Sequence, residues 1–250
     1  MRHPWFTAVL VAALCWGAVG RADERDTDGP LGEFMDAFAD FVAMQVAATA
    51  DRTGVETLDK RVRRAIAHTP RHAFVPPQLR PYAYADTPLP LGHGQNISQP
   101  FIVALMTHLA RIEPTDVVFE TGTGAGWQAA ILSKLAARVV SVEFIQPLAE
   151  RATRRLTRMG YDNVQVHIGD GYYGRAADGP YDAIIIKEAV RTLPPPLLKQ
   201  LKPGGRLIAP IGPEQGPQHL TVVEKAQDGS ISERRVLEVL FGFLPGGERI

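Results

Sequence analysis

The chain has 250 residues, of which 45% are hydrophobic, and its 27 basic residues balance its 27 acidic residues. This length and composition fit one globular domain with at most a short appendage. Without a net positive charge the chain has no field that would attract a polyanion, which argues against nucleic acid as a partner.

The first segment, residues 1–22, has the pattern of a secretory signal peptide. Arg2 precedes an apolar run from Trp5 to Val19, and Gly20-Arg21-Ala22 offers small residues at the expected cleavage site. The run is short for a membrane span, which needs about 20 residues, although an uncleaved anchor is the alternative. We therefore expect a secreted or periplasmic protein without stable membrane association, or a cytoplasmic one if the segment is no signal. The only cysteine, Cys15, lies here, so the mature chain would fold without a disulfide.

Two helices and a long loop are expected next. Apolar residues recur at helical spacing from Leu31 to Ala50 and from Glu56 to His68. The proline- and tyrosine-rich stretch that follows is irregular, and long irregular segments inside compact domains are usually functional. Ser98 and Pro100 fit the N-cap and the first position of a further helix.

A strand, a tight turn and a helix are predicted around a glycine-rich loop. The apolar run Val117-Val118-Phe119-Glu120 ends in a carboxylate, and Gly122-Thr123-Gly124-Ala125-Gly126 follows. Glycines let backbone approach a ligand, and a helix N-terminus offers unpaired N–H groups. Trp127 stands where a dinucleotide fingerprint needs a glycine, which argues against NAD. A strand-final acid instead suits a ligand with a cationic amino-acid end, such as S-adenosylmethionine, although an ordinary glycine turn is the alternative.

Strands and helices alternate after this loop. Further strands are expected at 139–142, 164–168, 182–186 and 206–211, and helices at 146–158 and 195–201. Residues 220–224 and 235–240 are predicted to form a final antiparallel pair joined through Asp228-Gly229. The pattern predicts a parallel sheet with helices on both faces, whose ligands bind at the carboxyl ends of the strands.

Acidic residues lie at those predicted strand ends. Glu143 comes about 20 residues after Gly122, where an acid binds two ribose hydroxyls. Asp170 ends the next strand, in position to hydrogen-bond an adenine amino group. Each acid alone fits an ordinary turn residue, but Glu120, Glu143 and Asp170 together, in register with a glycine loop, favour a cofactor site.

Five stretches together resemble the protein-L-isoaspartate O-methyltransferases, from about residue 35 to about residue 245. They are 71–76, 92–100, 120–126, 169–171 and 203–206. The resemblance implies an α/β fold with a Rossmann-like seven-stranded methyltransferase sheet, helices on both faces and an N-terminal helical extension. A single domain would cover 23–250, with a helical and substrate-loop region at 31–98 and a Rossmann-like core at 99–250.

The resemblance also implies a reaction and a set of site residues. S-adenosylmethionine would methylate isoaspartyl residues of damaged proteins and peptides, and D-aspartyl residues less efficiently, and we expect a monomer. Ser98 would hydrogen-bond the substrate carboxylate, and Asn96 and Ile97 would line the cofactor and peptide. The implied cofactor-binding residues are Glu120, Gly122, Thr123, Gly124, Gly126, Glu143, Asp170, Gly171 and Gln218.

This chemistry needs neither a metal nor a catalytic triad. A carboxyl group with a reference pKa of about 4 is already ionised at neutral pH. Proximity and orientation can contribute about 7–11 kcal/mol to such a transfer. The methyl ester would then cyclise to a succinimide unaided and open partly to normal aspartate. His72, His93 and His167 show no ligand spacing, so no metal site is expected.

Two positions depart from the family pattern. Asn96 stands where the family usually has threonine, and Lys187-Glu188 replaces a small, alanine-rich segment. The new pair is either an exposed ion pair worth about 0–1 kcal/mol or a cause of altered substrate choice or lost activity. Two other functions stay open: methyl transfer to another carboxylate, and a non-catalytic protein that kept the fold.

Overall fold

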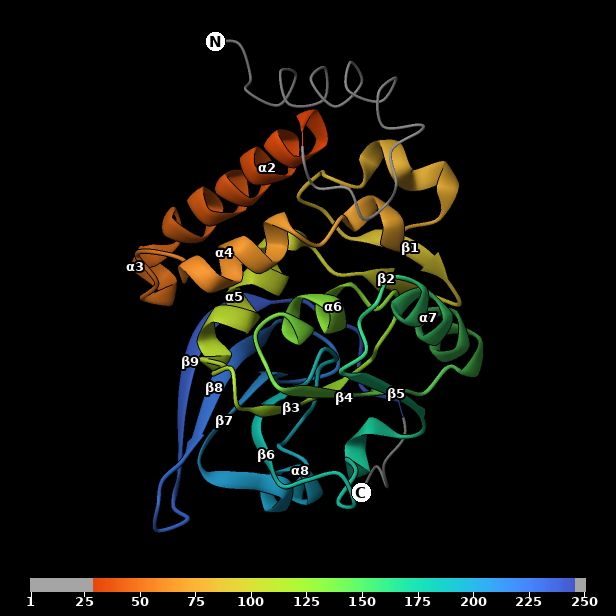
Figure 1. Cartoon of the computed structure of the whole chain (residues 1–250). Helices are drawn as coiled ribbons and strands as arrows, with labels where there is room; N and C mark the ends of the chain where they lie inside the picture. Colours follow the sequence, from red (N-terminus) through yellow and green to blue (C-terminus); the bar gives the residue numbers. More distant parts are fainter. Residues whose placement is uncertain (1–28, 246–250) are drawn as a thin grey trace.

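The computed structural model describes residues 29–245, which contain a seven-stranded sheet with helices on both faces (Figure 1). The strand order is β5-β4-β3-β6-β7-β8-β9. Strands β3 to β7 are parallel to one another, and β8 is antiparallel to both β7 and β9. The bounds are β3 Val117–Thr121, β4 Arg138–Glu143, β5 Val164–Ile168, β6 Tyr181–Ile185, β7 Leu201–Ile211, β8 Gln218–Lys225 and β9 Ile231–Val239. The predicted Rossmann-like sheet and its final antiparallel pair are confirmed, while the predicted signal segment, residues 1–22, lies outside the described residues.

The helices form two layers, one on each face of the sheet. Helices α5, α6 and α7 cover one face, with α2 and α4 packed outside them, and α8 and η3 lie on the other face (Figure 1). The bounds are α2 Pro30–Ala47, α3 Ala50–Thr53, α4 Lys60–Ala67, η1 Arg71–Phe74, η2 Pro77–Tyr82, α5 Pro100–Ala110, α6 Trp127–Ser133, α7 Gln146–Arg158, η3 Gly171–Tyr173 and α8 Pro195–Gln200. The predicted helices on both faces and the N-terminal helical extension are therefore present.

The apolar core is divided by the sheet into two clusters. Val118 packs in the cluster that contains Leu105 and Ile131 from the helices above the sheet. The next residue, Phe119, packs in the cluster that contains Leu197 of α8. Successive side chains of a strand point to opposite faces, so a strand covered on both faces is apolar throughout.

Several element boundaries differ from the sequence prediction. Helix α4 begins at Lys60 rather than Glu56, because the Asp59 carboxylate caps it by accepting from Arg61 N at 2.6 Å. The first predicted helix corresponds to α2, which ends at Ala47 rather than Ala50, and the short helix α3 follows it. The turn expected at Pro203-Gly204-Gly205 is an irregularity inside β7, where the pairing with β6 shifts register and Gly204 has a φ of 82°.

The segment predicted to be an irregular loop contains a hairpin and is tied down by one buried arginine. Strands β1 (Leu89–Gly92) and β2 (Gln95–Ile97) are antiparallel. The turn residues His93 and Gly94 have φ values of 55° and 72°, as two-residue hairpin turns require. The Arg71 guanidinium donates to the carbonyls of Ala83 at 2.6 Å, Thr87 at 3.1 Å and Ser98 at 2.9 Å.

The N-cap assignment of Ser98 is wrong, and a distant carboxylate does the capping instead. Helix α5 starts at Pro100, as predicted, but its N-cap is Gln99, which makes no side-chain capping bond. Asp86 accepts from Phe101 N at 2.8 Å and from Gln99 Nε2 at 3.0 Å. No hydrogen bond of the Ser98 hydroxyl is found among the described residues, so this hydroxyl is available to a ligand.

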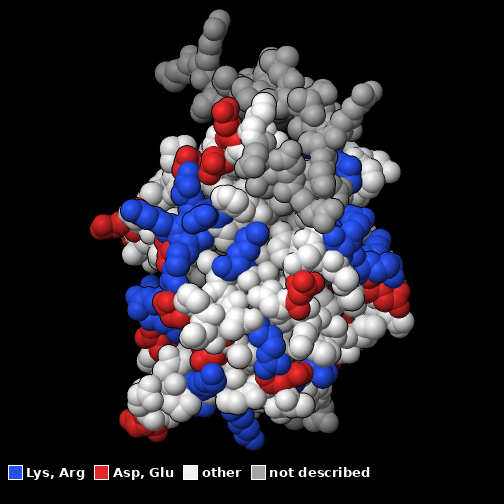
Figure 2. All heavy atoms as spheres, in the orientation of Figure 1, with Lys and Arg blue, Asp and Glu red and all other residues white. Residues whose placement is uncertain are grey.

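Charged side chains of both signs are interspersed on the face shown in Figure 2. Among the described helices, none combines the length and apolarity needed to cross a bilayer.

Candidate active site

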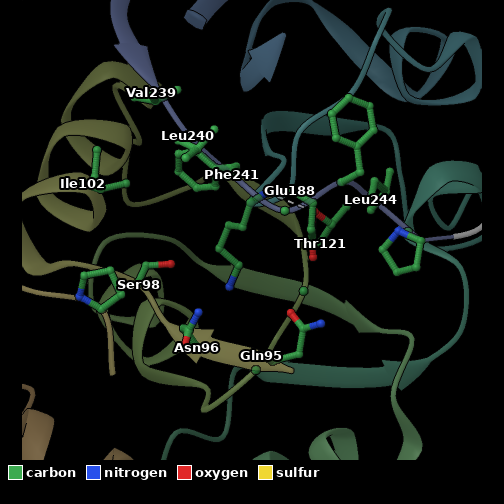
Figure 3. A pocket seen from close by; sticks show the side chains of 18 of the residues that line it. Gln95, Asn96, Ser98, Ile102, Thr121, Glu188, Val239, Leu240, Phe241 and Leu244 are labelled. Atoms are coloured by element: carbon green, nitrogen blue, oxygen red, sulfur yellow. Dashed lines mark hydrogen bonds between the residues drawn. The ribbon is translucent and has the colours of Figure 1, made fainter. Parts of the chain in front are cut away.

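A cavity of about 480 Å³ lies at the carboxyl ends of β3, β4 and β6 (Figure 3). Its volume falls within the range of about 300–1,000 Å³ that is usual for small-molecule sites. The lining includes Asn96, Ser98, Ile102, Thr121, Gly122, Gly124, Glu143, Phe144, Gly171, Lys187, Glu188 and the C-terminal segment 237–245. The substrate loop, the glycine loop and three strand ends therefore meet around one space, as the sheet topology predicts.

The three loop glycines have two different structural roles. Gly122, Gly124 and Gly126 have φ values of 61°, 56° and 86°, in the left-handed region that favours glycine. Gly122 and Gly124 line the cavity. Gly126 does not; a Cβ there would lie 3.2 Å from Leu156 Cδ1, so it allows α6 to pack closely on α7. At Gly122 a Cβ would collide with the Glu188 carboxylate, so the missing side chain lets that carboxylate lie against the loop backbone at the cavity.

Glu143 is both a structural anchor and a cavity-lining acid. Its side chain is buried at the end of β4, with Oε2 accepting from Gly124 N at 2.7 Å and Oε1 from Ile145 N at 2.9 Å. A carboxylate offers about four lone-pair sites, so each oxygen keeps one for a further donor. Glu143 can thus hold the glycine loop and accept two hydroxyl groups of a ligand together.

Glu120, by contrast, is enclosed and does not line the cavity. It is 0% exposed, its Oε1 accepts from Ser141 Oγ at 2.7 Å, and its Oε2 lies 2.9 Å from Lys187 Nζ. The Lys187 side chain is 8% exposed. The reading of Lys187-Glu188 as an exposed ion pair is therefore wrong, because Lys187 pairs with Glu120 inside the protein. The Thr123 hydroxyl, 2.6 Å from Ser141 Oγ, completes this enclosure.

Glu188 does line the cavity, next to the glycine loop. Its Oε2 accepts from Thr121 Oγ1 at 2.5 Å, and Thr121 Oγ1 in turn accepts from Lys187 N at 3.1 Å. Burial raises the pKa of Glu188 to about 7, assisted by the negative charges of Glu143 and Glu120 and opposed by the Thr121 hydrogen bond and Lys187. This carboxyl group is therefore partly protonated at neutral pH.

The remaining predicted residues lie partly inside and partly outside the cavity. Ile97 and Thr123 line a hollow of about 30 Å³ that shares Asn96, Ser98 and Lys187 with the main cavity. Gly171 lines the main cavity.

Asp170 and Gln218 do not line the main cavity and have structural roles. Asp170 accepts from Tyr172 N at 2.9 Å and caps η3. Gln218 is fully buried, donates to the carbonyls of Pro213 and Gly216 and accepts from Phe241 N at 2.9 Å. Gln218 therefore holds the chain that borders the cavity.

Sequence reasoning missed the C-terminal segment 237–245 as part of the site. Ala189 joins it to the end of β6, since Ala189 N donates to Gly242 O at 2.7 Å and Leu244 N to Ala189 O at 2.9 Å. Leu240 is 80% exposed at the cavity, and Phe144 is 52% exposed on the β4 side. Large exposed apolar side chains beside a cavity are typical of binding surfaces. The apolar residues that follow β9 are the sequence signal by which this segment could have been found.

No group of three or more His, Cys, Asp and Glu side chains within residues 29–245 is placed to hold a metal ion. His72 instead lies 2.7 Å from the Tyr84 hydroxyl, through Nδ1.

The sheet order, the glycine loop and the acid at the end of β4 define a Rossmann-like S-adenosylmethionine-dependent methyltransferase. The family described as protein-L-isoaspartate(D-aspartate) O-methyltransferase (PCMT) matches residues 45–249, and the chain belongs to this family.

Curated relatives agree with this assignment over nearly their whole length. Protein-L-isoaspartate O-methyltransferase 2 of Polaromonas sp. is 51% identical over 201 residues, which cover 80% of this chain and 95% of the relative. Protein-L-isoaspartate O-methyltransferase 2 of Syntrophobacter fumaroxidans is 45% identical over 239 residues, which cover 96% of this chain and 95% of the relative.

Solved structures share the fold. One named protein-L-isoaspartate O-methyltransferase has a TM-score of 0.71 at 28% identity, covering 83% of this chain and 66% of that chain. A Plasmodium falciparum structure in complex with S-adenosyl-L-homocysteine has a TM-score of 0.66 at 22% identity, covering 81% of this chain and 97% of that chain. The latter likeness concerns the fold alone.

Proposed function

We propose that this protein transfers the methyl group of S-adenosylmethionine to the carboxylate of isoaspartyl residues in damaged proteins. The observation that carries the proposal is the convergence of Ser98, Glu143 and the Gly122–Gly124 backbone on one cavity. Ser98 comes from the substrate loop and the other two from the cofactor end of the sheet. A hydroxyl with no partner among the described residues thus faces the space where methyl donor and acceptor meet.

The cavity fits S-adenosylmethionine by the chemistry of its lining. Gly122 and Gly124 present backbone without side chains, and Glu143 has unused lone pairs on both oxygens for the ribose hydroxyls. Gly171 lines the cavity just after β5, the strand next to β4 in the sheet, and the adenine would lie there. When bound, the cofactor supplies a sulfonium methyl group as the electrophile.

The protein's task in this reaction is orientation rather than activation. An isoaspartyl carboxylate, with a pKa of about 4, is a nucleophile at neutral pH without a general base. The Ser98 hydroxyl donates a hydrogen bond to that carboxylate and fixes its direction. Arg71 and Asp86 fix Ser98, since Arg71 binds the Ser98 carbonyl and Asp86 caps the helix that follows. Such orientation can supply about 7–11 kcal/mol.

Methyl transfer to a panel of acceptors tests the proposal against its alternatives. The purified protein is incubated with labelled S-adenosylmethionine and an isoaspartyl peptide, the matching aspartyl peptide, or small carboxylates. Label on the isoaspartyl peptide alone is the expected result. Label on another carboxylate instead would favour a different acceptor, and cofactor binding without any transfer would favour a non-catalytic protein.

We also propose that the protein is exported and works as a monomer outside the cytoplasm, on protein rather than nucleic-acid partners. The proposal is supported by Arg2, the apolar run 5–19 and the small residues before Asp23. N-terminal sequencing of the protein from its native host should give a start near Asp23. An intact Met1 in the soluble cytoplasmic fraction would contradict it.

A further inference from the structure

The amino-acid end of S-adenosylmethionine carries an α-ammonium group, and the sequence assigns its recognition to Glu120. The structure leaves Glu120 unable to do this. Both of its oxygens are engaged, one by Ser141 and one by Lys187, and the side chain is 0% exposed. Its charge is already balanced by Lys187 at 2.9 Å. A second ammonium group has no access to it.

Glu188, by contrast, lines the cavity and lies against the glycine loop. A Cβ built on Gly122 would come within 1.9 Å of Glu188 Oε1, so this carboxylate lies directly over the Gly122 backbone. Thr121 holds the other oxygen, Oε2, at 2.5 Å. No hydrogen bond to Oε1 is found among the described residues. Figure 3 shows Glu188 and Thr121 together at the cavity. One oxygen is therefore fixed and the other is free to accept from a ligand.

We propose that Glu188 binds the α-ammonium group of S-adenosylmethionine, in place of Glu120. This inference rests on the proposed use of that cofactor. It explains the Lys187-Glu188 pair as one unit: Lys187 neutralises the enclosed Glu120, and Glu188 supplies the carboxylate that faces the ligand.

The charges around Glu188 favour an incoming cation. Burial is the largest cause of the raised pKa of Glu188, and the negative charges of Glu143 and Glu120 add to it, while among the described residues Lys187 is the cation that opposes the shift. Lys187 is committed to Glu120. A ligand ammonium at Oε1 would offset the cost of a carboxylate held away from water, because opposite charges within about 4–6 Å stabilise each other's ionised forms.

Two ligands that differ only at the amino-acid end provide the test. S-adenosyl-L-homocysteine carries the α-ammonium and α-carboxylate groups, whereas 5′-methylthioadenosine retains the adenosine and thioether without them. Calorimetric titration of the purified full-length protein with both gives an affinity ratio, which does not depend on the fraction of folded protein. The variants are Glu188→Gln and, as the matched control, Glu120→Gln.

Glu188→Gln should weaken S-adenosyl-L-homocysteine binding by about ten- to a hundredfold, the effect of losing a charge-assisted hydrogen bond. Its affinity for 5′-methylthioadenosine should stay within about twofold. Glu120→Gln should lower the melting temperature, because it leaves Lys187 buried without a countercharge, and should keep the affinity ratio.

Three results would overturn the inference. The first is a Glu188→Gln variant with an unchanged ratio of the affinities for S-adenosyl-L-homocysteine and 5′-methylthioadenosine, and the second is tighter S-adenosyl-L-homocysteine binding in that variant. The third is a fall of this ratio in Glu120→Gln but not in Glu188→Gln. Tighter binding would mean that Glu188 faces the ligand's carboxylate. Absence of binding to the wild type would instead contradict the proposed function itself.

Discussion

Glu143 connects the glycine loop to the cofactor space through its two carboxylate oxygens. Glu143→Ala should weaken S-adenosylmethionine binding by about 1.5–3 kcal/mol, the range for lost hydrogen bonds to a charged group. Isothermal titration measures the change. Glu143→Gln keeps one carbonyl oxygen and should lose less. Unchanged affinity in the alanine variant would show that Glu143 does not bind the cofactor.

Ser98 is the residue whose role differs most between the sequence and the structure. Because Asp86 caps α5, removing the Ser98 hydroxyl should cost little stability. Ser98→Ala should lower turnover about ten- to a hundredfold and leave cofactor affinity nearly intact, since one hydrogen bond to a charged group contributes about 1.5–3 kcal/mol. Melting temperature and turnover are measured on the same preparation. A lower melting temperature with unchanged turnover would show that Ser98 has only a structural role.

Glu188 gives the ligand-free protein a characteristic pH dependence. Its pKa is raised to about 7 in the folded protein, above the ordinary value of 4.5, so the folded state binds more protons than the unfolded state between these pH values. Its contribution to stability is therefore favourable near pH 4.5 and is lost as the pH rises through 7. Glu188→Gln should raise the melting temperature at pH 8 and change it little at pH 5. Equal shifts at both pH values would contradict the raised pKa.

The residues of the site could be predicted only where local sequence carries the signal. Spacing from the glycine loop locates Glu143, because the loop, the helix and the next strand have nearly fixed lengths. The enclosure of Glu120 could not be predicted, since Lys187 is 67 residues away in the chain. The same holds for Asp86 and Gln218, whose partners depend on how loops pack.

At the scale of elements, the substrate loop depends on a long-range cap. Asp86→Ala would leave Phe101 N without its acceptor and release Gln99, costing about 1 kcal/mol, the usual effect of losing a helix cap. It should also lower turnover, because Ser98 lies one residue before the capped end. Thermal unfolding and methyl transfer are measured together.

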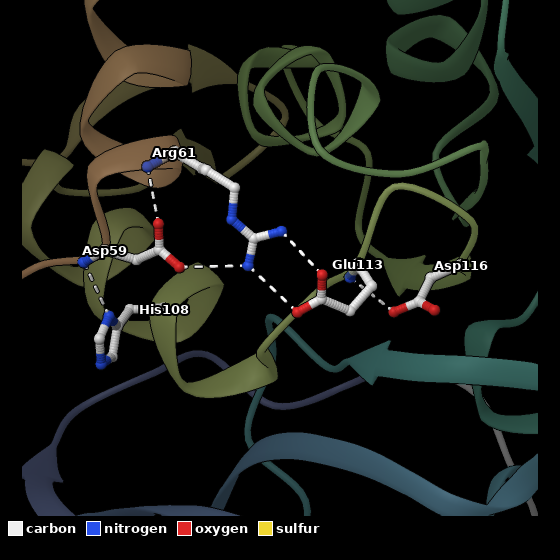
Figure 4. Close-up of polar contacts among 5 residues, drawn as sticks. All are labelled: Asp59, Arg61, His108, Glu113 and Asp116. Atoms are coloured by element: carbon white, nitrogen blue, oxygen red, sulfur yellow. Dashed lines mark hydrogen bonds and ion pairs between the residues drawn. The ribbon is translucent and has the colours of Figure 1, made fainter.

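A second capping aspartate provides the matched control. Asp59 accepts from Arg61 N at 2.6 Å and its own N–H donates to His108 Nδ1 at 3.0 Å, within the network shown in Figure 4. Arg61 also pairs with Glu113, and none of these residues lines the cavity. Asp59→Ala should lower the melting temperature comparably without changing turnover. Equal turnover in both variants would show that the Asp86 cap does not position Ser98.

Periodicity locates most helices and strands, because burial of one or both faces leaves a repeating apolar pattern. Helix α7 and strand β5 have the bounds that the pattern predicts. The β1–β2 hairpin was missed because its strands are only 4 and 3 residues long and its turn uses His93 with a positive φ, which few residues other than glycine adopt.

At the scale of the whole molecule, the sheet brings cofactor loop, substrate loop and C-terminal segment to one end. The alternation of strands and helices predicts the first two, since ligands of such sheets bind at the carboxyl ends of the strands. Residues 237–245 lie at the same end because of backbone hydrogen bonds with Ala189. Such a long-range contact leaves no periodic pattern in the sequence.

The most direct test of the central claim follows one peptide through repair. An isoaspartyl peptide is incubated with the purified protein and S-adenosylmethionine, and chromatography separates the isoaspartyl, succinimidyl and aspartyl forms over time. The account predicts a methyl ester, then a succinimide, then growth of the aspartyl peptide, with little conversion by the Ser98→Ala variant. An isoaspartyl peptide that stays unchanged while the protein demonstrably binds the cofactor would contradict the account.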